Sequence, residues 1–352
     1  MRVLVTGSSG LIGSEAVTFF DNLGFPVWGV DNNMRAEFFG PKGDTTWNRQ
    51  RLESGCKNFT HVEQDIRDRK GVEEVFKKIQ PELIIHAAAQ PSHDLAATKP
   101  FEDFDVNATG TLNLLEATRR QCPESPFIHV STNKVYGDGP NFIKMKELET
   151  RWDYDDPAFV DGIAESFSID QTKHSLFGAS KAAGDILAQE YGKYDGIELK
   201  TGIFRGGCLT GPQHSGVELH GFLNYLVLTA LREGKYTIFG YKGKQVRDQI
   251  HCHDVVNAFW HFAQNPKPGE VYNLGGGKGN AASLLECVSM IEERTGKKPE
   301  MTYSDENRVG DHICYYSDLS KLKKDFPGWD LTYSLDQIVD EMIQCIVDQQ
   351  RV

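Results

Sequence analysis

The sequence predicts an α/β fold, a doubly wound parallel sheet with a smaller C-terminal α/β lobe. Two observations carry this prediction. Six short apolar runs, each closed by turn residues, alternate with amphipathic stretches of helical period. After Arg205 this rhythm stops, and shorter pieces follow that glycine and proline punctuate.

The six runs are rich in Val and Ile and show little alternation, as buried parallel strands do. They are 2–7, 25–31, 59–65, 83–89, 127–132 and 200–206. Helical patterns at 71–79, 109–120 and 180–194 supply crossover connections, which are right-handed in such sheets. The polar stretch 142–169 is the longest expected loop, and the chain is expected to return to the first lobe near 247–262.

The composition excludes several classes of protein. A formal net charge of −12 argues against a nucleic-acid surface, because phosphate contacts need clustered Lys and Arg. No apolar run approaches the roughly 20 residues that cross a bilayer, and the first residues carry no secretory signal. The seven cysteines are scattered. We therefore expect a cytoplasmic protein with reduced thiols and no membrane or nucleic-acid partner.

The string HCHD, His251–Asp254, places two histidines on one face of a strand. Zinc sites need three or four ligands, and no second cluster completes this one. We expect a strand-to-helix junction with Asp254 as the helix cap, and no metal.

A glycine-rich turn joins the first predicted strand to the first helix. Gly7, Gly10 and Gly13 allow a tight turn, close approach of a pyrophosphate and close helix packing. The second strand ends at Asp31, about twenty residues on, where a carboxylate binds a ribose 2′-hydroxyl. This pattern predicts a Rossmann-type site that prefers NAD to NADP, although Arg35 nearby favours a 2′-phosphate.

The glycine spacing and later motifs resemble the extended short-chain dehydrogenase/reductase family, the NAD-dependent epimerases and dehydratases. These motifs are HAAAQ (86–90), VNATGTLNLLEA (106–117), STNKVYGD (131–138), GKQVRDQIHCHD (243–254) and RVGD (308–311). The resemblance implies a cofactor, NAD, bound by Gly7, Gly10, Leu11, Ile12, Gly13, Asp31, Asn32, Asp65, Ile66, Ala87, Ala88, Ala89, Asn107 and Lys181. It also implies an NAD-binding domain of 1–206 and 244–266, and a nucleotide-sugar-binding domain of 207–243 and 267–352.

Thr132 and Lys181 match the family's catalytic threonine and lysine. Members that dehydrate or decarboxylate sugars have a glutamate two residues after the threonine. In this chain the two positions after Thr132 are Asn133 and Lys134. Neither side chain replaces the proton chemistry of a carboxylate. The strings STNKVYGD and GKQVRD are most similar to the 2-epimerase group that acts on CDP-tyvelose and CDP-paratose, which works through a transient ketosugar.

The family's catalytic tyrosine is replaced by Phe177 in HSLFGASK, 174–181. Loss of a positioned acid–base group costs typically 10²–10⁴-fold in rate. Three interpretations stay open. Another group handles the proton, the substitution traps a bound complex, or the protein binds ligands without turnover. Substitute groups are a water molecule, Lys181, Lys134, Tyr136, His174 and Cys208.

The resemblance also implies the partner, a nucleotide-diphosphate sugar with CDP favoured. Guanidinium groups match phosphate oxygens, so Arg247 and Arg308 are candidates for its diphosphate. The full predicted substrate set is Gln90, His174, Arg205, Gln245, Arg247 and Arg308. By analogy with the fold, we expect a homodimer through 114–120 and the helix after Lys181.

Overall fold

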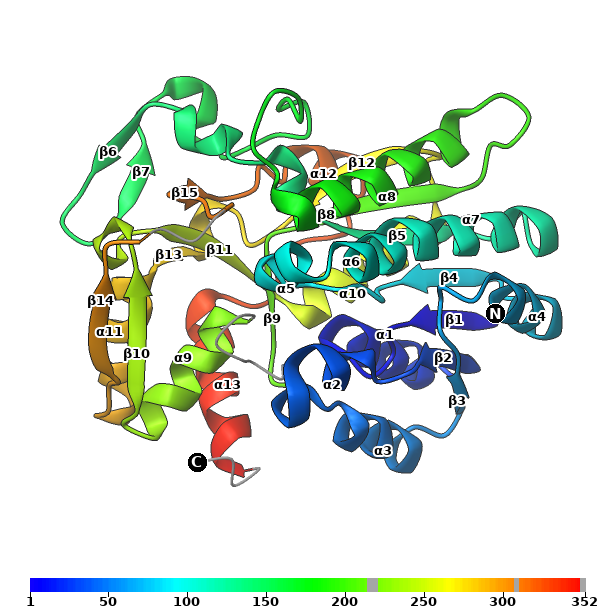
Figure 1. The fold of residues 1–352 in the computed structure, drawn as a ribbon, viewed down its shortest axis with the longest axis horizontal. Coiled ribbons are helices and arrows are strands. Elements are labelled where there is room, and N and C mark those ends of the chain that lie inside the picture. Colours follow the sequence, from blue (N-terminus) through cyan, green and yellow to red (C-terminus); the bar gives the residue numbers. More distant parts are fainter. Residues whose placement is uncertain (214–220, 307–309, 349–352) are drawn as a thin grey trace. The chain divides into compact units, whose positions relative to one another are not determined.

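A seven-stranded sheet is the central element of the computed structural model, which describes residues 1–213, 221–306 and 310–348 (Figure 1). Its strand order is β12-β8-β5-β4-β1-β2-β3. The strands are β1 (Val3–Thr6), β2 (Val27–Asp31), β3 (Phe59–Glu63), β4 (Leu83–His86), β5 (Phe127–Thr132), β8 (Thr201–Gly206) and β12 (Glu270–Leu274).

The order in which successive strands are added to the sheet reverses at β1. This strand pairs in parallel with β2 on one side and with β4 on the other, so Val3 is opposite both Val27 and Leu83. β2 also pairs in parallel with β3, and β4 with β5. In doubly wound sheets, ligands bind outside the carboxyl ends of the strands where the order reverses. The first βα turn, after β1, lies at that position.

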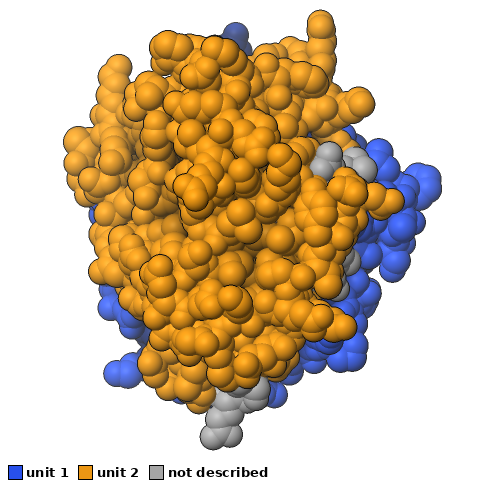
Figure 2. Space-filling view, turned by 90° about the vertical axis from the view of Figure 1, so that its left-hand side faces the viewer, with its two compact units in different colours: residues 1–135, 176–205, 255–272 blue, residues 136–175, 206–254, 273–352 orange. Residues whose placement is uncertain are grey.

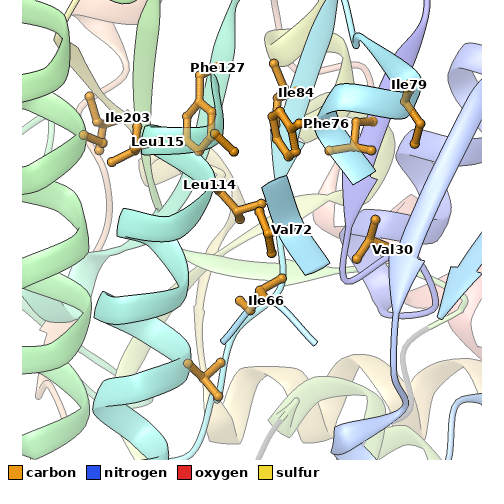
Figure 3. Packing of buried hydrophobic residues seen from close by; sticks show 14 of the residues in the cluster. Val30, Ile66, Val72, Phe76, Ile79, Ile84, Leu114, Leu115, Phe127 and Ile203 are labelled. Carbon is orange, nitrogen blue, oxygen red and sulfur yellow. The ribbon is translucent and has the colours of Figure 1, made fainter. Parts of the chain in front are cut away.

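Two helices, α4 (Arg69–Ile79) and α7 (Gly110–Gln121), cover one face of this sheet. They pack against each other and bury apolar side chains on the strands (Figure 3). The cluster includes Val72, Phe76, Ile79, Leu114 and Leu115 from the helices, and Val30, Ile84, Phe127 and Ile203 from the strands. The remaining helices on this sheet are α1 (Leu11–Asn22), α2 (Met34–Phe39), α3 (Thr46–Gly55), α5 (His93–Thr98), α6 (Pro100–Phe104), the π-turn η2 (Asp105–Thr109), α8 (Ser175–Lys193) and α10 (Cys252–Gln264).

The chain forms two compact units, which Figure 2 colours separately. Unit 1 comprises 1–135, 176–205 and 255–272, and unit 2 comprises 136–175, 206–254 and 273–352. These units divide the chain differently from the predicted domains: 136–175, 206 and 244–254 group with unit 2, and 267–272 group with unit 1. The assignment of the predicted domains to cofactor and nucleotide sugar stays a prediction.

Unit 2 has its own α/β core. Helices α9, α11 and α13 bury Leu226, Ile291 and Ile338, among others, in one apolar cluster. Its sheets are β13-β11-β15 with β9 beside β11, the pair β10-β14 and the hairpin β6-β7. The bounds are β6 (Met145–Glu147), β7 (Trp152–Tyr154), β9 (Cys208–Thr210), α9 (Phe222–Leu231), β10 (Lys235–Phe239), β11 (Val246–His251), β13 (Ala281–Ser283), α11 (Leu284–Thr295), β14 (Glu300–Ser304), β15 (Cys314–Tyr315), α12 (Ser320–Asp325) and α13 (Leu335–Asp348).

The structure confirms the fold class, all six predicted strands and the three predicted helices. It adds β12, a seventh strand that was not predicted from the sequence. The expected loop 142–169 contains the short hairpin β6-β7. The seven cysteines all lie in the described part of the chain and are free thiols. None of the helices in the described ranges has the length and apolarity needed to cross a bilayer.

The junction at HCHD needs one correction. β11 ends at His251 and α10 begins at Cys252, as expected. However, the His251 Nδ1 accepts the N–H of His253 at 3.1 Å, so the strand-end histidine caps this helix. The carboxylate of Asp254 instead accepts hydrogen bonds from the backbone N–H groups of Thr332 and Tyr333, at 3.0 and 3.2 Å.

Candidate active site

The glycine turn after β1 shows why two of its glycines cannot change. Gly7 has a φ of +68°, and a Cβ there would lie 2.7 Å from the backbone N of Ala88. A Cβ on Gly13 would lie 2.0 Å from the Gly7 carbonyl oxygen, so α1 could not pack this close to the turn. At Gly10 a Cβ would meet, among described atoms, only that oxygen at 3.3 Å. The fold itself constrains Gly10 least, which leaves the open backbone that a pyrophosphate approaches.

Asp31, at the end of β2, bonds both to the glycine turn and to the loop that follows β2. One carboxylate oxygen accepts the N–H of Ser9 at 2.9 Å, and the other accepts the N–H of Asn33 at 2.8 Å. Both bonds hold a fixed negative charge beside the glycine turn, which suits a ribose hydroxyl and repels a 2′-phosphate. Arg35 lies with its guanidinium 4.8 Å from the centre of the Phe39 ring, and burial lowers its pKa to about 10.

The other predicted cofactor residues follow β2, β3 and β4. The Asn32 Oδ1 accepts the N–H of Met34 at 3.3 Å. Burial acts to raise the pKa of Asp65, but hydrogen bonds and the charge of Arg67 outweigh burial and lower it. Ile66 is buried in the core cluster under α7. Leu11 and Ile12 open α1, and Ala87, Ala88 and Ala89 follow β4, where the N–H groups of Ala87 and Ala88 bond to Thr6.

The carboxyl end of β5 brings the predicted catalytic residues together in unit 1. The Thr132 Oγ1 accepts the N–H of Lys134 at 3.2 Å, while Asn133 is almost completely buried. Lys181 is buried as well, and its Nζ donates to the carbonyl oxygen of Val130 at 2.8 Å. Burial lowers the pKa of Lys181 to about 8, although the charges of two nearby aspartates oppose this shift. The ammonium group therefore lies against the strand that ends in Thr132.

Buried polar side chains form a hydrogen-bond network that reaches the first turns of α8, which carries Lys181. Asn107 accepts the N–H of Gln90 at 3.0 Å. Its Nδ2 lies within hydrogen-bond distance of three acceptors, the carbonyl oxygen of Gln90, the Asp103 carboxylate and the Ser180 hydroxyl, which share its two N–H groups. The Gln90 amide donates to Asp103 at 2.7 Å and accepts the N–H of Ser92 at 2.5 Å. Both predicted ligand contacts, Asn107 and Gln90, thus bond to the protein in this structure and fix the loop after β4.

Phe177 lies in the first turn of α8, one helical turn before Lys181, and only 7% of its surface is exposed. Its ring meets the imidazole of His93 edge-to-face, with ring centres 4.8 Å apart. Sequence reasoning missed His93. The signal was available in QPSHD, 90–94, which places a titratable side chain directly after the predicted cofactor loop, where α5 begins.

Arg205 forms a buried ion pair with Asp185. Its guanidinium donates to both carboxylate oxygens of Asp185 on α8, at 3.0 and 2.9 Å. Ser131 donates to the same carboxylate at 2.6 Å. Because both groups are almost completely buried, this pair joins β8, α8 and β5 within unit 1.

The other predicted substrate residues lie in unit 2. Arg247 on β11 is buried, donates to the carbonyl oxygen of Val246 at 2.7 Å and forms an ion pair with Asp311. The Gln245 Oε1 is buried and has no hydrogen-bond partner among the described residues. The His174 Nδ1 contacts the carbonyl oxygen of Thr172 at 3.0 Å. Arg308 lies outside the described residues.

Known proteins share both the sequence pattern and the fold. Residues 3–275 match the model of the NAD dependent epimerase/dehydratase family. CDP-paratose 2-epimerase of Salmonella typhi is 33% identical over 300 residues, which cover 83% of this chain and 84% of that protein. A probable dTDP-glucose 4,6-dehydratase of Sinorhizobium fredii is 28% identical over 346 residues, 96% of this chain and 85% of that protein.

Solved structures agree. UDP-glucuronic acid 4-epimerase from Bacillus cereus, in complex with UDP-glucuronic acid and NAD, superposes with a TM-score of 0.80 at 25% identity. That match covers 99% of this chain and 100% of the other. UDP-glucose 4-epimerase of Thermus thermophilus in complex with NAD gives a TM-score of 0.78 at 26% identity, covering 99% of each chain. The chain therefore belongs to the NAD dependent epimerase/dehydratase family, and its cofactor is NAD.

Proposed function

We propose that this protein is a nucleotide-sugar epimerase that inverts C2 of a CDP-linked sugar. The observation that carries the proposal is the end of β5, where Asn133 and Lys134 follow Thr132. A dehydratase needs a carboxyl group here to move a proton during elimination, and an amide or an ammonium group cannot do this. The 33% identity to a CDP-paratose 2-epimerase supports the same choice and favours CDP.

NAD, when bound, can take a hydride from a sugar carbon and return it to the opposite face. The protein's own residues prepare this exchange. Thr132 offers a hydroxyl for a sugar oxygen at the end of β5. Lys181, held by the Val130 carbonyl, places a positive charge beside the same strand end. That charge would stabilise the negative charge that develops on the sugar oxygen as its proton leaves.

In unit 2, Arg247 and Gln245 on and next to β11 are proposed to bind the diphosphate end of the sugar nucleotide. Arg247 offers a buried guanidinium group and Gln245 an amide NH2 group, and both are donors for phosphate oxygens. Arg308 and His174 remain proposed contacts from the sequence. We also propose the homodimer through α7 and α8, where Ile186 of α8 is 45% exposed.

The first test offers CDP-paratose, with NAD present, and follows the products by NMR. We expect the C2 isomer to form until both isomers are at equilibrium. Lys181→Met should abolish this interconversion, because it removes the buried ammonium group. Lys200→Met, which changes a lysine paired with Glu124 at the surface, is the matched control and should retain full activity.

Other outcomes identify the alternatives. Inversion at C4 would replace the proposed position with a 4-epimerase activity. Net accumulation of reduced cofactor would indicate an oxidoreductase, and loss of water would indicate a dehydratase like the relatives that are 28% identical. Tight binding of nucleotide sugar without any change would indicate a binding protein, and each of these results contradicts the proposal.

A further inference from the structure

Oxidation of a sugar carbon requires a group that takes the proton of its hydroxyl. This inference rests on the proposed function, which needs such a group twice in each turnover. Phe177 stands one turn before Lys181 and carries no hydroxyl. The group that replaces this hydroxyl should lie beside the Phe177 ring and be able to gain and lose a proton near neutral pH.

His93 meets both conditions. Its imidazole lies edge-to-face against Phe177, with ring centres 4.8 Å apart and planes at 63°. Both residues belong to unit 1, and His93 is half-buried, so its ring keeps some access to solvent. Imidazole is the side chain whose ordinary pKa is nearest to neutral, and histidine is the commonest general acid–base residue.

The polar network described above fixes His93 and Phe177 with respect to each other. His93 is the first residue of α5, which Ser92 caps by accepting the N–H of Leu95 at 3.3 Å. Ser92 is bound to Gln90, and Gln90 is bound to Asn107.

The same asparagine reaches Phe177 from the other side. Asn107 donates to the Ser180 Oγ at 3.1 Å, and that hydroxyl donates to the carbonyl oxygen of Phe177 at 3.0 Å. The π-turn η2 that carries Asn107 is a kind of irregularity found frequently at functional sites. One buried amide thus anchors both the loop of His93 and the first turn of α8.

Three of the substitute groups considered from the sequence, Lys181, Tyr136 and His174, are engaged in other contacts. The Lys181 Nζ donates to Val130. Tyr136 is completely buried, and its hydroxyl donates to Asn273 at 2.8 Å. His174 bonds through Nδ1 to the carbonyl oxygen of Thr172. None of these contacts places a proton acceptor against the ring of Phe177.

We propose that His93 is the proton-transfer residue of this site and does the work of the hydroxyl that Phe177 lacks. In the oxidation, the sugar O–H bond breaks and its proton goes to an imidazole nitrogen. The C–H bond breaks at the same carbon, its hydrogen leaves with the electron pair to oxidised NAD, and the C–O bond becomes a carbonyl. In the return step the carbon regains its hydrogen and the imidazolium returns the proton to the oxygen.

The test measures kcat, KM and their pH dependence with CDP-paratose for His93→Asn, Phe177→Tyr and the double variant. His93→Asn should lower kcat about 10²–10³-fold with little change in KM, since an amide keeps hydrogen bonding but cannot carry the proton. It should also remove the acid limb of the pH profile. The double variant should recover to within about tenfold of the unaltered protein, because the tyrosine restores a hydroxyl beside Lys181.

The charged groups on the elements around His93 are Asp94 on α5, Glu102 and Asp103 on α6, and Lys181, Asp185, Glu190 and Lys193 on α8. The variant Asp94→Asn therefore serves to show how far a neighbouring charge alone moves the pH limb. His261→Asn, on α10, is the matched control and should keep both rate and profile. Calorimetry of NAD binding shows that each variant is folded.

Three results would overturn the inference. A His93→Asn variant within about twofold of the unaltered protein would exclude a proton-transfer role. A loss that Phe177→Tyr does not rescue would assign His93 a structural role. If the unaltered protein binds NAD but turns over no CDP-paratose, the proposed function is wrong. His93 then has no proton transfer to perform, and the inference fails with the proposed function.

Discussion

The role proposed for Lys181 and the stability of the fold make opposite demands on this residue. Its ammonium group is buried, so the folded state must hold a charge that water would solvate better. Its pKa is lowered to about 8 from an ordinary value of 10.5 for this reason. The Val130 carbonyl compensates only one of the three N–H donors among the bonds described for it.

Lys181→Met should therefore stabilise the protein while it abolishes turnover. We expect the free energy of unfolding at pH 7 to rise by about 1–3 kcal/mol, because the buried charge is removed. In the unaltered protein the unfolded chain binds more protons than the folded chain between pH 8 and 10.5, so stability rises with pH across this window. The variant should lack this rise. Denaturant titrations at several pH values measure both effects.

Lys200→Met is the control for this measurement, since the exposed pair with Glu124 contributes little. It should change stability by less than about 0.5 kcal/mol and leave the pH dependence intact. A Lys181→Met variant that is less stable than the unaltered protein at pH 7 would show that the ammonium group is a net structural support.

The glycine turn after β1 is an element in which each glycine has a different task. Gly13→Ala should destabilise the fold, because its Cβ would lie 2.0 Å from the Gly7 carbonyl oxygen. Gly10→Ala should change stability by no more than about 1 kcal/mol, since its φ of −78° suits alanine. It should still weaken NAD binding at least about tenfold, because a methyl group would occupy the approach of the pyrophosphate.

Thermal unfolding and calorimetry of NAD binding separate these two effects. Gly55→Ala, in α3, is the matched control: its Cβ would meet nothing within 4 Å, so NAD affinity should stay unchanged and stability should rise by no more than about 1 kcal/mol. Unchanged NAD affinity in Gly10→Ala would mean that the pyrophosphate does not approach the turn at this residue.

Helices and strands with a clear pattern of apolar residues were predictable from the sequence. Segments whose shape depends on polar contacts were not. The six strands and the helices α4, α7 and α8 follow from apolar runs and helical spacing. The loop from Gln90 to η2 could not be predicted, because its shape depends on hydrogen bonds between residues up to 73 positions apart, such as Asn107 to Ser180. β12 was missed because its pairing with β8 depends on the sheet rather than on a local pattern.

At the scale of the whole molecule, the sequence predicted the fold class, the family and the cofactor. The assignment of 136–175 to the cofactor-binding part stays a prediction, and by their contacts these residues group with unit 2. The motifs named candidate site residues but not the groups that these residues bond to in the fold. Arg205 illustrates this: the motif suggested a ligand contact, and the fold gives it a buried carboxylate, Asp185. Partners of this kind arise only when distant strands and helices meet.

The central claim is that one sugar carbon is oxidised and then reduced again by the same enzyme. The most direct measurement uses CDP-paratose carrying deuterium at C2, in ordinary water with NAD present. The account predicts that the inverted product keeps the deuterium at C2, because the hydrogen that leaves the carbon is the one that returns. Replacement of the label by hydrogen from water during inversion would mean that C2 loses a proton instead, and it would contradict the account.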